Sequence, residues 1–491
     1  MKKFYTTTAI AYPNSDPHVG FAYELVLADV QARWHRLKGE KVFFLTGTDE
    51  HGLKIQRAAE KVGLKPQQFV DQQVEKFKGL CKEWNISYDR FIRTTDSDHV
   101  KVSQAVFQKV LDTGDIYLGQ YEGLYCVSCE NYYTEKDLEN GFCPVHKKPV
   151  ENVKEETYFF RLAKYQKQLL EFFEKNPEFI SPESRRQEIV NRVKEGLRDL
   201  SVSRTSFKWG IPLPNDPKHV QYVWFDALLN YYSATRAKKE LNEYWPADVH
   251  NIGKDIAWFH CVIWPCMLFS AGIEPPKHVF IHGFINTESG EKLSKTAGNA
   301  LEPVALAKQF GVDQLRYFFL REIPFGQDGF FSSALLQARV NNELANGLGN
   351  LLNRSLTLAE KKLNGKITKQ KTDLELEKQL NVPKIEKLMN GFLFHQALTE
   401  IFSFVAACNK YVNDQKPWEQ GEKAAAVTLY NVVDALRVLA ILLEPFIPQT
   451  SEKINAQLGL KKANLAEAKL GLLKGTVVHK GEILFSKIEL K

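Results

Sequence analysis

The sequence has little of several features that would assign a protein to a class at once. None of its apolar runs is long enough to span a bilayer, and the longest, Val438 to Leu443, is predicted to belong to a core helix. Lys2 and Lys3 precede a threonine-rich stretch and not the apolar region of a signal peptide. Seven cysteines in 491 residues exclude a disulfide scaffold. We therefore expect a cytoplasmic protein with no membrane segment.

Strong charge of one sign and internal repeats are also missing. The formal net charge is only +6, which permits a polyanionic partner but does not require one. No fixed-period repeat or low-complexity tract is visible. With 44% hydrophobic residues the chain can bury a large core, and its length predicts two to four domains.

Strand and helix patterns alternate through much of the chain. The segment Lys41 to Gly47 is typical of a buried strand, and Pro66 opens an amphipathic helix. A further strand is predicted from His278 to Ile285, so a parallel sheet with helices on both faces is expected. Residues 151–217 look irregular and punctuated by proline, and from Phe331 onward strands disappear in favour of an α-helical bundle.

These changes of pattern predict five segments. Two halves of an α/β domain occupy 1–116 and 220–330, and an insertion separates them at 117–219. A helical domain follows at 331–462. The tail at 463–491 mixes glycine with alternating apolar residues, and its pattern does not assign it to a class.

The stretch from Phe4 to Phe21 organises the α/β part. Its first half is β-branched and aromatic, it turns at a Pro-Asn-Ser-Asp-Pro cluster, and a helical pattern follows from Ala22 to Lys38. A strand, a tight turn and a helix N-terminus together form an anion site, where His18 supplies a donor and Gly20 a bare backbone. On these residues alone, an ordinary turn with a surface histidine is the favoured interpretation.

Four residues in the insertion have the spacing of metal ligands. Cys126, Cys129, Cys143 and His146 form paired knuckles with two residues inside each pair. Thiolate and imidazole are the ligands that Zn²⁺ prefers, and four protein ligands close the site, which predicts one structural zinc per chain. Coincidental loop cysteines are the minor alternative. The other four cysteines lie in apolar helical patterns and are interpreted as core residues: Cys81, Cys261, Cys266 and Cys408.

A polar loop at 286–299 follows a predicted strand. It contains Lys292, Ser294 and Lys295 together with glycine. Two lysines three residues apart suit a segment that closes on phosphates, because ammonium groups neutralise the charge that spreads over a leaving pyrophosphate. Taken alone, this is only a polar loop.

Taken together, the two loops resemble the paired motifs of the class I aminoacyl-tRNA synthetases. The family's HIGH motif matches His18-Val19-Gly20-Phe21, and its KMSKS motif matches Lys292 to Thr296. Within that class the chain is most similar to the methionyl-tRNA synthetases that carry a single zinc knuckle. The resemblance covers nearly the whole chain and includes AYPNSDPHVG, FLTGTDEHG, LYCVSCENYYTEKDL, YVWFDALLNYY, IGKD and REIPFGQDG.

This resemblance implies a Rossmann-type catalytic domain split by a zinc-bearing insertion, a helical anticodon-binding domain, and a role for each matching residue. The implied catalytic residues are His18, Lys292 and Lys295. The implied ATP site comprises His18, Gly20, Phe21, Glu24, Gly253, Asp255, Lys292, Ser294 and Lys295. The implied methionine pocket comprises Ile10, Tyr12, Asp49, Trp224, Ala227, Leu228, Tyr231, Ile256 and His260.

The chemistry of that pocket agrees with methionine. A long thioether needs an aromatic and aliphatic sleeve, and its sulfur can accept a weak hydrogen bond from a tyrosine hydroxyl or a histidine. Asp49 suits the ammonium group as its counter-charge. Without the resemblance, core packing is the preferred interpretation of Trp224 and Tyr231.

Three residues of the helical part resemble the family's anticodon-reading residues. Asn350 and Arg354 are four apart and therefore share a helix face. Trp418 can stack on an unstacked base while the polar pair reads base edges. Ordinary bundle residues remain a serious alternative for Asn350.

Position 21 departs from the family pattern, which ends in a second histidine. Phe21 cannot donate to a phosphate oxygen, so activation is expected to be slower or to use a neighbouring donor. Two alternatives therefore stay open. One is a class I synthetase for another apolar amino acid, although residues 117–217 look too short for an editing insertion. The other is a tRNA-binding paralogue weakened in catalysis.

The resemblance implies a two-step reaction with ATP, L-methionine and tRNA(Met), including the initiator, as substrates. The methionine carboxylate attacks the α-phosphate of ATP, with Mg²⁺ on the departing pyrophosphate, and the tRNA 3′ hydroxyl then takes the aminoacyl group. No protein nucleophile is needed, because positioning and charge stabilisation carry the reaction. With no appended oligonucleotide-binding domain visible, a monomer is the preferred expectation.

Overall fold

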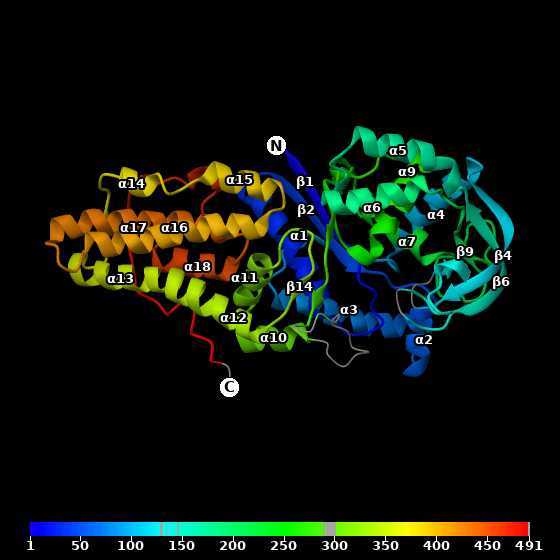
Figure 1. The fold of residues 1–491 in the computed structure, drawn as a ribbon, viewed down its shortest axis with the longest axis horizontal. Helices are drawn as coiled ribbons and strands as arrows, with labels where there is room; N and C mark the ends of the chain where they lie inside the picture. The colour runs from blue at the N-terminus through cyan, green and yellow to red at the C-terminus, as the bar shows by residue number, and fades with distance from the viewer. Residues whose placement is uncertain (128–130, 134, 145–146, 288–289, 291–300, 490–491) are drawn as a thin grey trace.

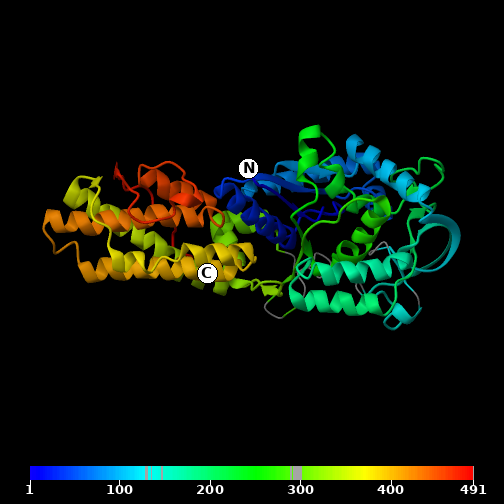
Figure 2. The same cartoon turned by 90° about the horizontal axis from the view of Figure 1, so that it is seen from above.

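The computed structural model describes residues 1–127, 131–133, 135–144, 147–287, 290 and 301–489. The molecule is elongated (Figures 1 and 2), with the parallel sheet and its helices in the middle, a β-rich insertion at one end and a helical domain at the other.

A six-stranded parallel sheet forms the centre of the α/β part. Its order is β3-β2-β1-β11-β12-β7. The strands are β1 (Lys3–Thr8), β2 (Lys41–Thr48), β3 (Arg90–Arg93), β7 (Ile180–Ser181), β11 (Val249–Gly253) and β12 (Val279–His282). Because β2 and β3 extend the sheet on one side of β1 while β11 and β12 extend it on the other, the strand order reverses between β1 and β11. In open α/β sheets, ligands bind in the crevice at the carboxyl ends of the strands at such a point.

Helices cover both faces of this sheet, as predicted. Side chains alternate along β1 and β2, so Phe4 and Phe44 pack into one core with α1 and α3, while Tyr5 and Phe43 pack into a second core with α4 and α9. The helices of this part are α1 (Val19–Leu37), α2 (Leu53–Lys61), α3 (Pro66–Glu83), α4 (Ser97–Asp112), α7 (Val223–Leu228), α8 (Asn230–Ser233), a π-helical turn (Phe259–Ile263), α9 (Trp264–Ala271), α10 (Pro303–Phe310) and α11 (Val312–Glu322).

The insertion is more regular than the sequence suggested. Its own sheet has the order β5-β4-β6-β8, from β4 (Ile116–Cys126), β5 (Asn131–Tyr133), β6 (Glu151–Phe160) and β8 (Leu200–Ser201). Helices α5 (Gln166–Lys175) and α6 (Glu183–Lys194) follow β6, and β7 between them pairs with β12 of the central sheet. The prediction of an irregular segment at 151–217 was therefore wrong for these elements. The charged residues of β6 obscure its strand pattern in the sequence. In the structure, ten residue pairs with β4 hold it as a strand.

Two further short pairs complete the α/β part. β9 (Ser203–Arg204) is antiparallel to β10 (Val220–Gln221), and β13 (Ile285–Asn286) is parallel to β14 (Gly329–Phe330). The pair β13–β14 brings the segment that enters the polar loop at 286–299 beside the segment that leads into the helical domain.

The helical domain is the predicted bundle with one β addition. Its elements are α12 (Ser333–Arg339), a π-helical stretch (Val340–Gly349), α13 (Asn350–Leu363), α14 (Leu374–Glu377), α15 (Val382–Asn390), α16 (Phe394–Gln415), α17 (Glu422–Leu443) and α18 (Pro448–Gln457). The antiparallel pair β15 (Lys366–Thr368) and β16 (Gly475–Val477) shows that the predicted loss of strands beyond 331 was wrong. Three-residue strands carry too little alternation to be recognised from the sequence.

The unassigned tail packs back onto the bundle. Tyr430 donates to the carbonyl of Leu473, and Arg437 donates to the carbonyls of Glu467 and Lys469. Within the described residues, α17 is the helix long and apolar enough to cross a membrane, and 89% of its most apolar window is buried inside the protein. This burial is that of a core helix, as predicted for Val438 to Leu443.

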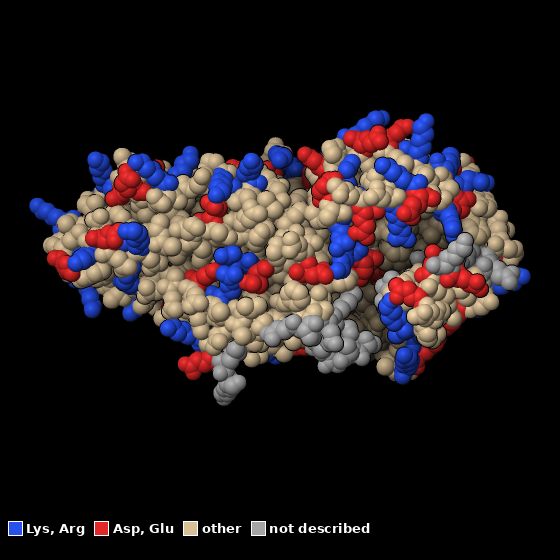
Figure 3. Space-filling view, in the orientation of Figure 1, with Lys and Arg blue, Asp and Glu red and all other residues tan. Residues whose placement is uncertain are grey.

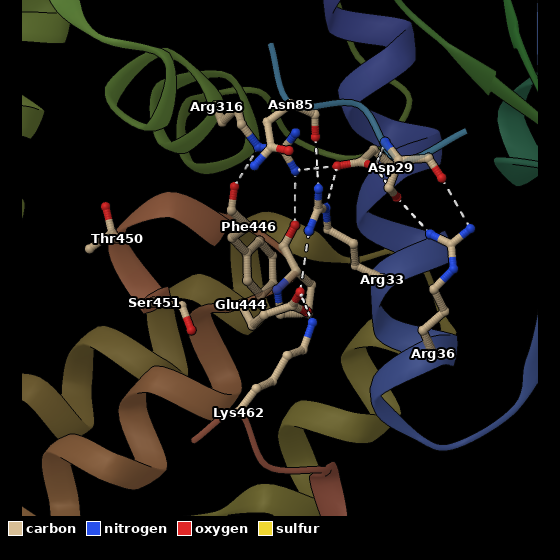
Figure 4. A network of polar contacts seen from close by, with 12 residues as sticks. Asp29, Arg33, Arg36, Asn85, Arg316, Glu444, Phe446, Thr450, Ser451 and Lys462 are labelled. Atoms are coloured by element: carbon tan, nitrogen blue, oxygen red, sulfur yellow. Dashed lines mark hydrogen bonds and ion pairs between the residues drawn. The ribbon is translucent and has the colours of Figure 1, made fainter. Parts of the chain in front are cut away.

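Charged side chains join the helical domain to α1 (Figure 4). Arg33 of α1 donates to Asp29 on its own helix and to Glu444, which follows α17. Arg316 of α11 contacts Asp29 and donates to the carbonyls at the turn between α17 and α18. The catalytic part and the bundle therefore share one buried polar junction.

Candidate active site

The sequence predicts an anion site at the turn after β1 and the start of α1. α1 begins at Val19, earlier than the predicted Ala22, and His18 is its N-cap. The Gly20 N–H donates to Nδ1 of His18 over 3.1 Å, and the Phe21 N–H donates to the His18 carbonyl. A Cβ on Gly20 would lie 3.0 Å from the His18 ring, so glycine is what allows the imidazole to fold over the helix start. His18 is exposed there, at the positive end of the helix dipole.

Phe21 turns away from this turn. Its side chain is 8% exposed and meets the ring of Phe77 on α3 edge-on, with ring centroids 5.3 Å apart. Its backbone N–H takes part in the turn and its ring belongs to the core. Phe21, the residue that departs from the family pattern, therefore packs against an aromatic neighbour.

Glu24 ties α1 to two strands. Its carboxylate accepts from the Ala9 N–H just after β1 at 2.7 Å and lies 2.9 Å from Nε2 of His282 at the end of β12. Burial raises the pKa of Glu24 despite the histidine beside it. The pKa of His282 is also raised, because the nearby Glu24 carboxylate outweighs the effect of burial on the imidazole.

The end of β11 supplies the remaining predicted nucleoside residues. A Cβ on Gly253 would lie 2.8 Å from Oδ1 of Asp255, so the backbone at this strand end is bare on the side that Asp255 faces. Asp255 is exposed, whereas Gly253 is buried. These residues follow the strand adjacent to β1, which places them across the switch point from His18.

Asp49 lies on the other side of β1, immediately after β2. It is 4% exposed, and its N–H donates to the Ala11 carbonyl at 2.8 Å. Ile10 and Tyr12 lie in the same crossing segment after β1, and the Tyr12 hydroxyl donates to the carbonyl of His51. The predicted ammonium ligand and two predicted pocket residues are thus brought together.

The residues predicted to form the sleeve lie on α7, α8 and the π-helical turn and contact one another. Trp224 stacks on Phe259 with ring centroids 3.9 Å apart, and Ala227 and Leu228 of the same helix are buried. The Tyr231 hydroxyl lies 2.7 Å from Nε2 of His260. Burial lowers the pKa of His260 to about 4, so its imidazole is neutral at physiological pH.

The hydrogen bonds of His260 define its tautomer. Nδ1 lies 3.0 Å from the carbonyl of Ile256, which can only accept, so Nδ1 carries the proton. Nε2 is then an acceptor, and the Tyr231 hydroxyl donates to it. The polar protons of Tyr231 and His260 are both engaged within the protein, so neither is left for a thioether sulfur in this arrangement. Sulfur contact with the aromatic rings is what the sleeve offers.

Sequence reasoning missed three residues of this region. Phe259 stacks on Trp224, His250 of β11 stacks on Tyr231 with centroids 4.1 Å apart, and His282 pairs with Glu24. His250 lies on β11 and His282 on the adjacent parallel strand β12, where it is the last residue. A polar residue in an otherwise apolar strand was the available signal.

Several predicted residues lie outside the described part of the chain. They are Lys292, Ser294 and Lys295 of the polar loop, and Cys129 and His146 of the zinc quartet. Their partners Cys126, at the end of β4, and Cys143 are 1% and 0% exposed. Among described residues, no group of three or more histidine, cysteine or acidic side chains could hold a metal. Two buried thiols in a small subdomain are nevertheless the donors that zinc prefers.

The predicted anticodon residues lie toward one end of the bundle. Asn350 and Arg354 are both on α13, and Arg354 donates to Asn409 and Asn413 near the end of α16. The connection from α16 to α17, which includes the 43% exposed Trp418, is at the end remote from the central sheet (Figure 1). On the face in Figure 3, charges of both signs are interspersed, so no broad basic field dominates it.

Comparison with known proteins agrees with this geometry. The profile of the family described as "tRNA synthetases class I (M)" matches residues 4–151 and 134–356. The protein is therefore a class I tRNA synthetase.

Further matches narrow the class. The profile "Anticodon binding domain of methionyl tRNA ligase" matches residues 363–491. A methionine–tRNA ligase of Caldanaerobacter subterraneus is 48% identical over 100% of this chain and 80% of its own length. The chain belongs to the methionine–tRNA ligase family.

Solved structures give the same result for the fold. Mycobacterium tuberculosis methionyl-tRNA synthetase in complex with methionyl-adenylate has a TM-score of 0.95 at 41% identity, covering 99% of this chain and 100% of that one. The apo form of that enzyme has a TM-score of 0.89 at 38% identity, covering 100% of this chain and 99% of that one.

Proposed function

We propose that this chain activates L-methionine with ATP and transfers it to the 3′ end of tRNA(Met), with its active site at the carboxyl edge of the central sheet. The observation that carries the proposal is the convergence there of His18, Glu24, Asp49, Gly253 and His282, which come from segments far apart in the sequence. The switch point between β1 and β11 is where such a fold binds nucleotides.

Each group has a role in the first step. The start of α1, with His18, receives the phosphates of ATP, which arrives as its Mg²⁺ complex. Gly253 and Asp255 hold the nucleoside beside Glu24. Lys292 and Lys295 neutralise the charge that develops on the departing pyrophosphate, with Ser294 between them.

Asp49 holds the methionine ammonium group, and the sleeve of Trp224, Tyr231 and His260 encloses the thioether. The methionine carboxylate is thereby held to attack the α-phosphate. No side chain needs to act as a nucleophile, because the gain comes from holding two substrates in reactive geometry.

The helical domain supplies tRNA recognition in this proposal. Arg354 and Asn350 read base edges, and Trp418 stacks on an unpaired anticodon base. The 43% exposed ring of Trp418 supports this role, because a large aromatic side chain on a surface connection has little reason to be there for packing. The domain limits remain those of the sequence analysis, with 331–462 as the bundle.

Zinc is proposed as a structural ion of the insertion, held by Cys126, Cys129, Cys143 and His146. It would supply a cross-link between two knuckles and no chemistry. The burial of Cys126 and Cys143 supports the proposal. We further propose that the enzyme acts as a monomer in the cytoplasm.

The test is methionine-dependent ATP–pyrophosphate exchange, followed by aminoacylation of tRNA(Met). Methionine is expected to support exchange well above leucine, norleucine and homocysteine. Exchange with leucine but not with methionine would show that the enzyme activates a different amino acid. Binding of tRNA without exchange for any amino acid would show that the protein binds tRNA but is not a catalyst.

A further inference from the structure

A carboxylate held between two histidines lies directly behind the proposed methionine pocket. Asp226 of α7 is 1% exposed, and its Oδ2 is 2.6 Å from Nδ1 of His51. Its Oδ1 is 2.7 Å from Nε2 of His99 on α4, and Nδ1 of His99 is 2.7 Å from the Ser233 hydroxyl of α8. Burial alone would raise the pKa of Asp226, but the two histidines outweigh it and lower the pKa. The side chain is therefore a carboxylate with both oxygens accepting.

His51 ends the short segment that contains Asp49. Main-chain hydrogen bonds hold this segment closely: the Asp49 N–H donates to Ala11, and the Gly52 N–H donates to Trp209. Its carbonyls accept from side chains, Glu50 from the Trp209 indole at 2.6 Å and His51 from the Tyr12 hydroxyl at 2.7 Å.

The side chain of Glu50 strengthens this hold. It is fully buried, and Arg93 of β3 donates to both its oxygens at 2.7 and 2.9 Å. The segment from Asp49 to Gly52 is thus fixed to the segment after β1, to β3 and to the strand connection at Trp209.

None of the hydrogen bonds just described joins the segment from Asp49 to Gly52 to α7. α7 carries Trp224, Ala227 and Leu228, the proposed sleeve. The hydrogen bond from His51 to Asp226 joins the Asp49 segment to that helix, and the bond from His99 holds Asp226 from behind. Ammonium ligand and sleeve are therefore connected through one buried carboxylate.

We propose that Asp226, held by His51 and His99, is a positioning residue that sets the distance between the Asp49 carboxylate and the aromatic sleeve, and thereby the affinity for the amino acid. This inference rests on the proposed function of the site. Its effect falls on the amino acid and not on ATP, because the nucleotide groups at His18, Glu24 and Gly253 are on other elements.

The experiment compares Asp226→Asn and His99→Gln with Ser103→Ala in the exchange assay on the full chain. Ser103 is the matched control, because it is fully buried on α4 one turn beyond His99 and its hydroxyl donates to Gln221, outside the cluster. For D226N we expect the methionine KM to rise about tenfold and the ATP KM to change less than about twofold. For H99Q we expect a methionine KM rise of about threefold, and for S103A none.

A second readout separates an effect through the Asp49 segment from a direct effect on the thioether sulfur. Norleucine has the same ammonium group as methionine but no sulfur. If Asp226 acts through the Asp49 segment, the KM values for both amino acids rise by the same factor and their ratio is preserved.

Two results would overturn the inference: a methionine KM in D226N equal to that of the wild type, or an ATP KM that rises as much as the methionine KM. If D226N does not fold, H99Q decides by the same criteria, because it leaves the Asp226–His51 bond in place. Absence of exchange by the wild-type protein would refute the proposed function itself, which is a different outcome.

Discussion

Nη2 of Arg316 lies 2.7 Å from Oδ2 of Asp29, and both side chains are fully buried. Asp29 is on α1, the helix that His18 caps, and Arg316 is on α11 beside the helical domain. The same guanidinium donates to the carbonyls of Pro445 and Phe446 and, at 3.3 Å, to that of Trp84 (Figure 4). One side chain therefore holds the catalytic helix, the end of α3 and the end of α17 together.

Removing this cation should cost much of the stability of the junction. We expect Arg316→Met to lower the free energy of unfolding by about 3–5 kcal/mol, because it leaves Asp29 and three main-chain carbonyls without their shared donor. Urea denaturation measures the change. The control is Lys462→Met, whose ammonium contacts Glu444 but is 65% exposed, and which should cost less than about 1 kcal/mol. Equal costs for the two variants would contradict this account.

The bare backbone at Gly20 should be needed for activity. A methyl group there would lie 3.0 Å from Cε1 and Nδ1 of His18, so Gly20→Ala displaces the imidazole from the helix start. Because one positioned donor is typically worth 10²–10³-fold in rate, we expect kcat for pyrophosphate exchange to fall at least about tenfold. Gly79→Ala on α3, where nothing lies within 4 Å, should leave kcat unchanged. An active G20A enzyme would show that His18 does not act from this position.

Restoring the family histidine at position 21 should not accelerate the reaction. The Phe21 ring is directed at Phe77, so Phe21→His places a polar ring against an aromatic one and not in the phosphate turn. We expect an unchanged exchange rate and a loss of about 1–2 kcal/mol of stability. A faster F21H enzyme would mean that the imidazole reaches the phosphates and that position 21 limits the wild type.

The sleeve should discriminate by shape and ring contact. Tyr231→Phe leaves Nε2 of the buried His260 without its donor, so kcat/KM for methionine is expected to fall about 10–100-fold. Because the Tyr231 hydroxyl already donates its proton to His260, kcat/KM for norleucine should fall by the same factor. If the ratio between methionine and norleucine collapses instead, the hydroxyl contacts the sulfur directly.

Acid should destabilise the sleeve through its histidines. The pKa of His260 is lowered to about 4 by burial, and burial also lowers the pKa of His250 well below the ordinary value of 6.5. A depressed histidine pKa means that the unfolded chain binds the proton more readily, so stability is lost as pH falls below about 6.5. For His260 the loss reaches about 3 kcal/mol near pH 4. Urea midpoints between pH 7 and pH 4.5 test this, and His260→Asn should flatten the profile.

Much of the scaffold could be predicted from local pattern. The strands at 3–8 and 41–48 and the core helix at 422–443 were recognisable from continuous runs of apolar, aromatic or β-branched residues, and the helix from Pro66 from its amphipathic spacing. The motif around His18 and the spacing of the four zinc ligands are local too. These features, with the polar loop at Lys292, were sufficient to predict the family.

What the sequence could not determine depends on residues that meet only after folding. The two-residue strand β7 exists because β12 offers it a free edge, and the direction of the Phe21 ring is decided by Phe77, 56 positions away (77 − 21). The Asp226 cluster unites α7 with His51 and His99, 175 and 127 positions distant. Local propensity sets which elements form, whereas pairing partners, ring directions and proton positions follow from long-range contacts, and only the tertiary structure decided those.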